Sequence, residues 1–164
     1  MDASAVSVGA ASVPVTEVSF YHLQRAGLDR ALPKLLEKVL ERRKRALLVA
    51  GSEDRVAAIN ATLWTFDPAS FLPHGSKADG FASEQPVFLT ADAGENPNGA
   101  QVLVLVDGAA SGDLGRFERV LDIVDGKDPD AVADARERWQ ALTAAGHALT
   151  YWQQTEAGGW EKRG

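Results

Sequence analysis

The sequence contains no cysteine among its 164 residues. This absence excludes disulfide bonds, thiolate catalysis and cysteine-ligated zinc, and it fits a reducing compartment. The chain also lacks an apolar run long enough to span a bilayer, and its first residues lack the basic start and apolar core of a signal peptide. We therefore expect a cytoplasmic protein without a membrane partner.

Positive charge is scarce as well. The chain has 17 Lys and Arg against 23 Asp and Glu, which gives a net charge of -6 and a pI of about 5.0. A mostly acidic surface disfavours broad binding to nucleic acid or anionic membranes, so an acidic partner would need a local basic patch. The length and composition fit one soluble globular domain. We expect residues 1–14 to be a flexible N-terminal extension and residues 15–164 to form that domain.

No motif for phosphate binding or catalysis is recognisable. The turns QRAGLDR and AGSEDR match neither G-x-G-x-x-G nor G-x-x-x-x-G-K-[ST]. The stretch VLVLVDG is similar to the strand whose aspartate holds magnesium in P-loop enzymes. Because no phosphate loop accompanies it, a buried strand whose Asp107 begins a turn is the favoured interpretation. His22, His74 and His147 fall on different predicted elements and lack the spacing of a metal-binding pair. We predict no catalytic residue, no metal and no cofactor.

Short apolar runs alternate with amphipathic stretches along the chain. Predicted strands cover residues 16–23, 45–50, 87–90, 101–106, 117–124 and 147–155; predicted helices cover residues 28–43, 53–64 and 130–145. The turn sequence NPNG predicts that strands 87–90 and 101–106 form a hairpin. A ragged tail follows the last strand. Helices between apolar strands indicate a three-layer α/β domain with a mostly parallel sheet and some antiparallel edge.

An aromatic stretch, ATLWTFDPASFLPHG, occupies residues 61–75. It contains Trp64 and Phe71 and two prolines, Pro68 and Pro73. The preceding helix must end before Pro68, because proline lacks an N–H group and restricts the residue before it. Aromatic side chains in such a connection are either buried beneath it or offered to a partner.

The final helix carries a second candidate surface. Arg136 neighbours Trp139 at i, i+3 and Gln140 at i, i+4, and Arg138 adds another cation. Arginine beside an aromatic ring suits recognition of a carboxylate with an apolar anchor. The competing interpretation places Trp139 in an apolar stripe that packs into the core, and spacing alone favours it.

Together these stretches resemble the chi subunit family of bacterial DNA polymerase III. The resemblance runs from about residue 18 to the tail and rests on F-Y at 20–21, L-W-x-x-x-x-x-S-F-x-P-H at 63–74, V-x-D-x-V at 120–124, and A-R-E-R-aromatic at 135–139 followed by A-G. It implies a Rossmann-like fold without nucleotide chemistry. It also implies a non-catalytic accessory subunit of a DNA-directed DNA polymerase complex.

The resemblance further implies two protein partners and no sequence-specific contact with nucleic acid. One is the acidic C-terminal tail of single-stranded DNA-binding protein, which ends in an apolar residue and a free carboxylate. The other is the psi subunit, which links chi to the clamp loader and whose surface on this chain the sequence does not identify.

A set of peptide-binding residues follows from the resemblance: Trp64, Phe71, Val124, Arg136 and Trp139. Arg136 would take carboxylate charge, and the aromatic rings would hold the terminal apolar side chain. The family typically has lysine where this chain has Gln140, and tyrosine is common at the position of Trp139. Either another group, such as Arg138, compensates for the lost cation, or the affinity for the tail is lower.

Two hypotheses from other classes compete with this adaptor. A small nucleotide-dependent enzyme on a Rossmann-like frame is suggested by the fold and by VLVLVDG. A purely structural partner subunit without a peptide pocket is the other. It predicts that replacing Trp139 with alanine unfolds the domain.

Overall fold

The computed structural model describes residues 16–24, 27–65, 72–92, 94–109, 114–157 and 159–163. The predicted N-terminal extension lies outside them. In chain order the strands and α-helices are β1 (Glu17–Leu23), α2 (Leu28–Glu41), β2 (Ala46–Val49), α3 (Glu53–Thr65), β3 (Gly75–Ser76), β4 (Val87–Thr90), β5 (Val102–Leu105), β6 (Arg119–Asp125), α4 (Pro129–Ala144), β7 (Ala148–Gln154) and β8 (Trp160–Lys162). Among these residues no helix is long and apolar enough to cross a membrane.

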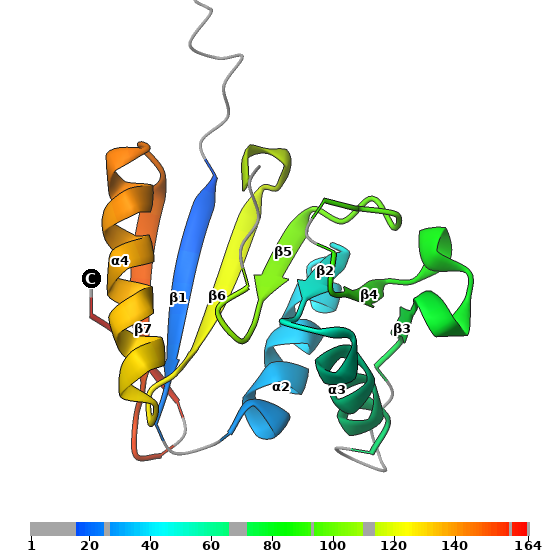
Figure 1. Cartoon of the computed structure of the whole chain (residues 1–164), viewed down its shortest axis with the longest axis horizontal. Helices are drawn as coiled ribbons and strands as arrows, with labels where there is room; N and C mark the ends of the chain where they lie inside the picture. Colours follow the sequence, from blue (N-terminus) through cyan, green and yellow to red (C-terminus); the bar gives the residue numbers. More distant parts are fainter. Residues whose placement is uncertain are drawn as a thin grey trace, which may run out of the picture.

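The described strands form one sheet in the order β3-β4-β2-β5-β6-β1-β7-β8 (Figure 1). Every pairing among β1 to β7 is parallel, and β8 pairs antiparallel with β7 at the edge. All four residues of β2 are buried, as expected of a central strand covered on both faces. The predicted α/β fold with a mostly parallel sheet and an antiparallel edge is confirmed.

The helices cover both faces of this sheet. Leu36 of α2 and Ile59 of α3 pack in one hydrophobic cluster. Ala135 of α4 packs in the other cluster, with Trp139 against its margin. The chain therefore has three layers, with α2 and α3 on one face and α4 on the other.

Local sequence explains where two of the helices begin. The Ser52 hydroxyl accepts a hydrogen bond from the backbone N–H of Arg55 at 3.2 Å, which confirms the predicted cap of α3. At α4, the Asp128 carboxylate accepts from the Asp130 N–H at 3.0 Å, and Pro129 occupies the first helical position. These caps fix both helix starts near the carboxyl ends of parallel strands.

The predicted hairpin is wrong. β4 and β5 lie on opposite sides of β2 and both run parallel to it. The turn sequence does make a local turn, because the Gly99 N–H donates to the Asn96 carbonyl at 3.3 Å. Burial decides the strand arrangement instead, since β4 and β5 are apolar on both faces and pair with the central strand.

The predicted ragged tail contains an ordered strand. Trp160 opens β8, and its ring meets the ring of Tyr21 edge-on with centroids 5.0 Å apart. The strand is short and polar after its first residue, so periodicity gave no signal for it. The single apolar residue that packs on the sheet was the available clue.

Candidate functional site

The end of α3 brings together the two ends of the aromatic stretch. Leu63 is buried, whereas Trp64 is 55% exposed, and the Trp64 ring lies 4.6 Å from the ring of His74. His74 is itself buried, with Nδ1 2.6 Å from the Leu72 carbonyl oxygen and Nε2 3.4 Å from the Asn60 carbonyl oxygen. Residues 72–74 therefore pack against α3, and His74 has a structural role.

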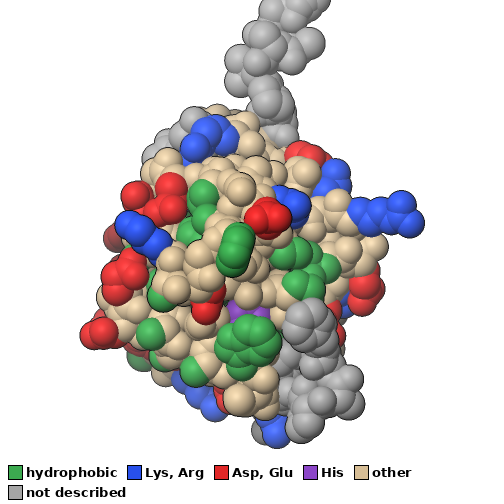
Figure 2. Space-filling view, turned by 90° about the vertical axis from the view of Figure 1, so that its right-hand side faces the viewer, with side chains coloured by type: hydrophobic (Ala, Val, Ile, Leu, Met, Phe, Trp, Pro, Cys, Tyr) green, Lys and Arg blue, Asp and Glu red, His purple; other side chains and the backbone are tan. Residues whose placement is uncertain are grey.

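Trp64 leaves a large apolar surface in contact with solvent. Figure 2 shows the side of the molecule that carries α3 and β3, where hydrophobic side chains reach the surface among acidic and basic groups. Phe81, on the connection between β3 and β4, is 74% exposed. The predicted pocket residue Phe71 lies outside the described residues.

Trp139 belongs to an aromatic cluster beneath α4. Its ring meets Phe20 of β1 and Tyr151 of β7 edge-on, with centroids 5.6 and 5.8 Å apart. Phe20 and Tyr151 stack on each other at 6.1 Å. Trp139 is only partly buried, so it packs against the core and still has an accessible edge. We call Phe20, Trp139 and Tyr151 the α4 aromatic cluster.

Arg138 is engaged by a buried acid. Its Nε and Nη2 donate to the two carboxylate oxygens of Asp122 at 2.8 and 2.9 Å, and the Asp122 side chain is 3% exposed. Burial raises the pKa of Asp122, while the hydrogen bond from Arg138 opposes the shift. This bidentate pair holds α4 to β6. Arg138 is therefore poorly suited to replace the cation missing at Gln140.

Sequence reasoning missed this pair, although two signals for it exist. Asp122 is the acid in V-x-D-x-V, in the middle of a strand whose other central residues are apolar and buried. A buried carboxylate needs a partner, and an arginine on the crossing helix supplies one. The aspartate of the V-x-D-x-V motif, which supported the family resemblance, thus serves to hold α4 against β6.

Arg136 and Arg138 lie on opposite flanks of α4. Residues two positions apart in an α-helix are separated by about 200° around its axis. Arg136 is exposed, and no hydrogen bond or ion pair joins it to another described residue. Gln140, one turn further on, is also exposed. This flank presents one cation and one amide to solvent.

The positive charge of Arg136 shifts the pKa values of two neighbouring groups, His22 and Tyr151. The His22 Nδ1 atom lies 2.6 Å from the Tyr151 hydroxyl oxygen. Burial lowers the pKa of His22, and Arg136 lowers it further. Burial raises the pKa of Tyr151, and Arg136 opposes that shift. Arg136 therefore lies close to the α4 aromatic cluster, and His22 can report on ligands that bind there.

Val124 occupies a different part of the site. It is 2% exposed near the carboxyl end of β6, and with Arg138 it lines a cavity of about 510 Å³. The cavity lies outside the ends of β1 and β6, where α2 and α4 depart to opposite faces of the sheet. Ligands of open α/β sheets usually bind at such a switch point.

The charges of this cavity do not suit an acidic or phosphorylated ligand. Five aspartates and three cations line it. One of the aspartates, Asp107, has a left-handed backbone with φ of 58° and holds Arg55 through two contacts of 2.8 and 3.1 Å. Within the described part of the chain, no cluster of acids and histidines could hold a metal ion. These contacts support the structural interpretation of Asp107 and weaken the nucleotide-enzyme hypothesis.

The predicted site residues therefore fall in three places. Arg136, Trp139 and Gln140 lie on α4, whereas Val124 and Arg138 line the cavity. Trp64 lies on α3, whose apolar residues pack on the sheet face opposite α4. The pairing of Trp64 with Arg136 in one pocket stays a prediction.

Fold and site together define a doubly wound α/β protein. The exposed guanidinium group of Arg136 lies beside the α4 aromatic cluster, and the strand-to-helix turns lack a phosphate-loop sequence. The family model of the DNA polymerase III chi subunit, HolC, matches residues 15–150. The chain therefore belongs to the chi subunit family, a family of replication accessory subunits, which confirms the resemblance. It is also 32% identical over 90 residues to the probable DNA polymerase III subunit chi of Rickettsia prowazekii (strain Madrid E). That match covers 55% of this chain and 54% of the relative, about half the length of each.

Proposed function

We propose that this chain is a non-catalytic replication adaptor. It binds the acidic C-terminal tail of single-stranded DNA-binding protein and links it to the clamp loader. Membership of the chi family supports the adaptor role. The observation that carries tail binding is Arg136, an exposed cation beside the α4 aromatic cluster on a protein of net charge -6.

The chemistry of the tail matches the flank of α4. The terminal carboxylate would form a bidentate contact with Arg136, whose planar guanidinium fits that geometry. The terminal apolar side chain would pack on the accessible edge of Trp139. The Gln140 amide supplies a neutral donor where the family commonly has a lysine. We therefore expect binding that depends on salt, because a charge pair at an exposed site is screened.

The remaining predicted residues have supporting roles in this proposal. Val124 is buried and contributes apolar volume from beneath the surface. Arg138 fixes the position of α4 through Asp122. Trp64 and Phe71 would contact another part of the peptide.

A peptide titration tests the proposal. We expect a short acidic peptide ending in Pro-Phe to bind with saturation in isothermal titration calorimetry. Arg136→Ala should weaken binding at least about tenfold, because a charge-assisted contact is worth about 1.5–3 kcal/mol. Trp64→Ala should weaken it less. Arg30→Ala, an exposed cation on the opposite face, is the matched control.

Two results would overturn the proposal. One is the absence of saturable binding by the unmodified chain. The other is binding that is indifferent to both Arg136→Ala and Trp64→Ala.

The link to the clamp loader is a separate part of the proposal. It would pass through a psi partner, as the family resemblance implies. Purification of the tagged chain from its own cells, with identification of bound proteins by mass spectrometry, tests this link. We expect a clamp-loader subunit to be retained. Recovery of single-stranded DNA-binding protein without any clamp-loader subunit would contradict the proposed link to the clamp loader.

A further inference from the structure

A second groove lies on the sheet face that carries α2, away from α4. Its volume is about 440 Å³. One wall consists of the C-terminal half of α2, including Val39, and of Arg42, which follows the helix. The other wall carries Tyr21, Trp152 and Trp160. The proposed tail-binding flank is on the opposite face. A ligand in this groove would not compete directly with a peptide at Arg136.

The aromatic wall of the groove is already packed against itself. Tyr21 and Trp152 stack with centroids 6.5 Å apart, and Trp160 meets Tyr21 edge-on. Tyr21 is only 8% exposed. Binding of single-stranded nucleic acid needs open ring faces on which bases can stack. The packing therefore favours an apolar peptide side chain over a base.

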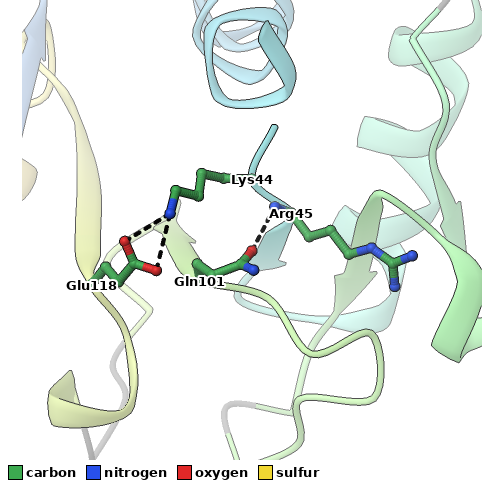
Figure 3. A network of polar contacts seen from close by, with 4 residues as sticks. All are labelled: Lys44, Arg45, Gln101 and Glu118. Atoms are coloured by element: carbon green, nitrogen blue, oxygen red, sulfur yellow. Dashed lines mark hydrogen bonds and ion pairs between the residues drawn. The ribbon is translucent and has the colours of Figure 1, made fainter. Parts of the chain in front are cut away.

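The groove is basic, in contrast to the protein as a whole. Four cations line it (Lys38, Arg42, Lys44 and Arg119), together with two glutamates. Figure 3 shows that one cation is paired, because the Lys44 Nζ atom lies 3.0 Å from a carboxylate oxygen of Glu118. The remaining positive excess complements an acidic partner and gives the contact its specificity.

Two buried donors in the groove lack acceptors. The Trp152 Nε1 and Arg119 Nε atoms have no hydrogen-bond partner among the described residues. The Arg119 Nη2 atom donates to the hydroxyls of Ser19 and Tyr21, at 3.2 and 3.3 Å. Buried N–H groups in folded proteins nearly always have an acceptor. Both donors belong to residues that line the same groove. A small shift of the side chains around them would let a carboxylate or carbonyl from outside the chain satisfy them.

We propose that this groove binds an acidic amphipathic segment of a partner protein. The segment places an apolar side chain against the aromatic wall and acceptor oxygens on Trp152 and Arg119. Its other carboxylates face Arg42 and Lys38. The proposal does not rest on tail binding at Arg136.

A labelled peptide titration tests the groove. The probe is a short peptide of alternating Glu and Leu with one Phe, amidated at its C-terminus so that it cannot imitate a free terminal carboxylate. Fluorescence anisotropy is measured with the full-length chain carrying Arg136→Gln. We expect saturable binding that weakens about tenfold with Trp152→Phe, which keeps the ring and removes the N–H donor. Arg42→Gln should weaken it about threefold and flatten its salt dependence.

Trp160→Phe is the matched control, because it makes the same exchange in the same groove at a residue without an orphaned donor. Equal effects of Trp152→Phe and Trp160→Phe would overturn the proposal. Binding of the Glu→Lys version of the peptide with similar affinity would also overturn it. Competition by oligo(dT) would assign the groove to nucleic acid. Tighter peptide binding after removal of residues 2–14 would assign it to the chain's own N-terminus.

Discussion

The flank of α4 and the end of α3 each present a tryptophan, but the two side chains have different surroundings. Trp139 packs edge-on against Phe20 and Tyr151, which lie on two neighbouring strands. Trp64 is 55% exposed and contacts His74 on the segment that follows its helix. The first ring is part of the fold with one edge available. The second ring leaves more than half of its surface open to solvent, which a partner could cover.

The largest expected difference between the two regions comes from the ion pair that holds α4. Arg138→Met leaves the Asp122 carboxylate buried without a cation. We expect this variant to lose about 4 kcal/mol of unfolding free energy near pH 8, because breaking a buried pair leaves an uncompensated charge. Urea denaturation measures the loss. Arg55→Met, at a more exposed ion pair, is the control and should lose about 1 kcal/mol or less.

The loss should depend on pH in a defined direction. Burial already raises the pKa of Asp122 above its ordinary value near 4, and removal of Arg138 raises it further. The folded variant then binds this proton more readily than the unfolded chain. Its stability therefore falls as pH rises from the ordinary value through the raised pKa, and the penalty shrinks as pH approaches 4. A penalty of constant size from pH 4 to 8 would show that Asp122 does not carry the buried charge.

The two tryptophans themselves provide the next comparison. Trp139→Ala should lower the unfolding free energy by about 2–3 kcal/mol, somewhat less than for a fully buried tryptophan. Trp64→Ala should change it by less than about 1 kcal/mol. Thermal and urea unfolding of both variants measure this contrast. Equal losses of unfolding free energy in the two variants would show that Trp64 supports the fold as much as Trp139 does. Complete unfolding of the Trp139→Ala variant would favour the structural-subunit hypothesis.

The smallest expected effect concerns His22. Burial and Arg136 lower its pKa below the ordinary value near 6.5, so its neutral form supports the fold. That stability is present above pH 6.5 and is lost as pH falls through the lowered pKa. Arg136→Gln should raise the pKa of His22, measured by NMR titration of its ring protons. An unchanged pKa of His22 would show that Arg136 does not lie close to the α4 aromatic cluster. Arg30→Gln is the control and should leave this pKa unchanged.

Much of the fold follows from the sequence because burial and periodicity agree. The apolar strands and the three helices were predicted within a few residues, since β2, β4 and β5 are buried on both faces and helix caps mark α3 and α4. Strand order was harder to predict. The turn at Asn96 was identified, but a local turn does not fix which strand its neighbours join.

The candidate site was only partly predictable for a related reason. Helical spacing placed Arg136 and Gln140 on an exposed flank, but it could not show that Arg138 turns toward Asp122 on a strand 16 positions earlier. The motif that contains Trp64 predicted an aromatic surface without giving its distance from α4. Such contacts depend on how distant segments pack, which residue patterns along the chain do not contain.

The central claim is that the flank of α4 at Arg136 receives an acidic peptide with a free carboxyl end. The most direct measurement is NMR mapping of the ¹⁵N-labelled chain during titration with the Pro-Phe peptide. The account predicts shifts of backbone signals around Arg136 and Gln140, together with a rise in the pKa of His22, because a bound carboxylate offsets the charge of Arg136. Shifts confined to the groove beside Trp152, with the α4 signals and the pKa of His22 unchanged, would contradict it.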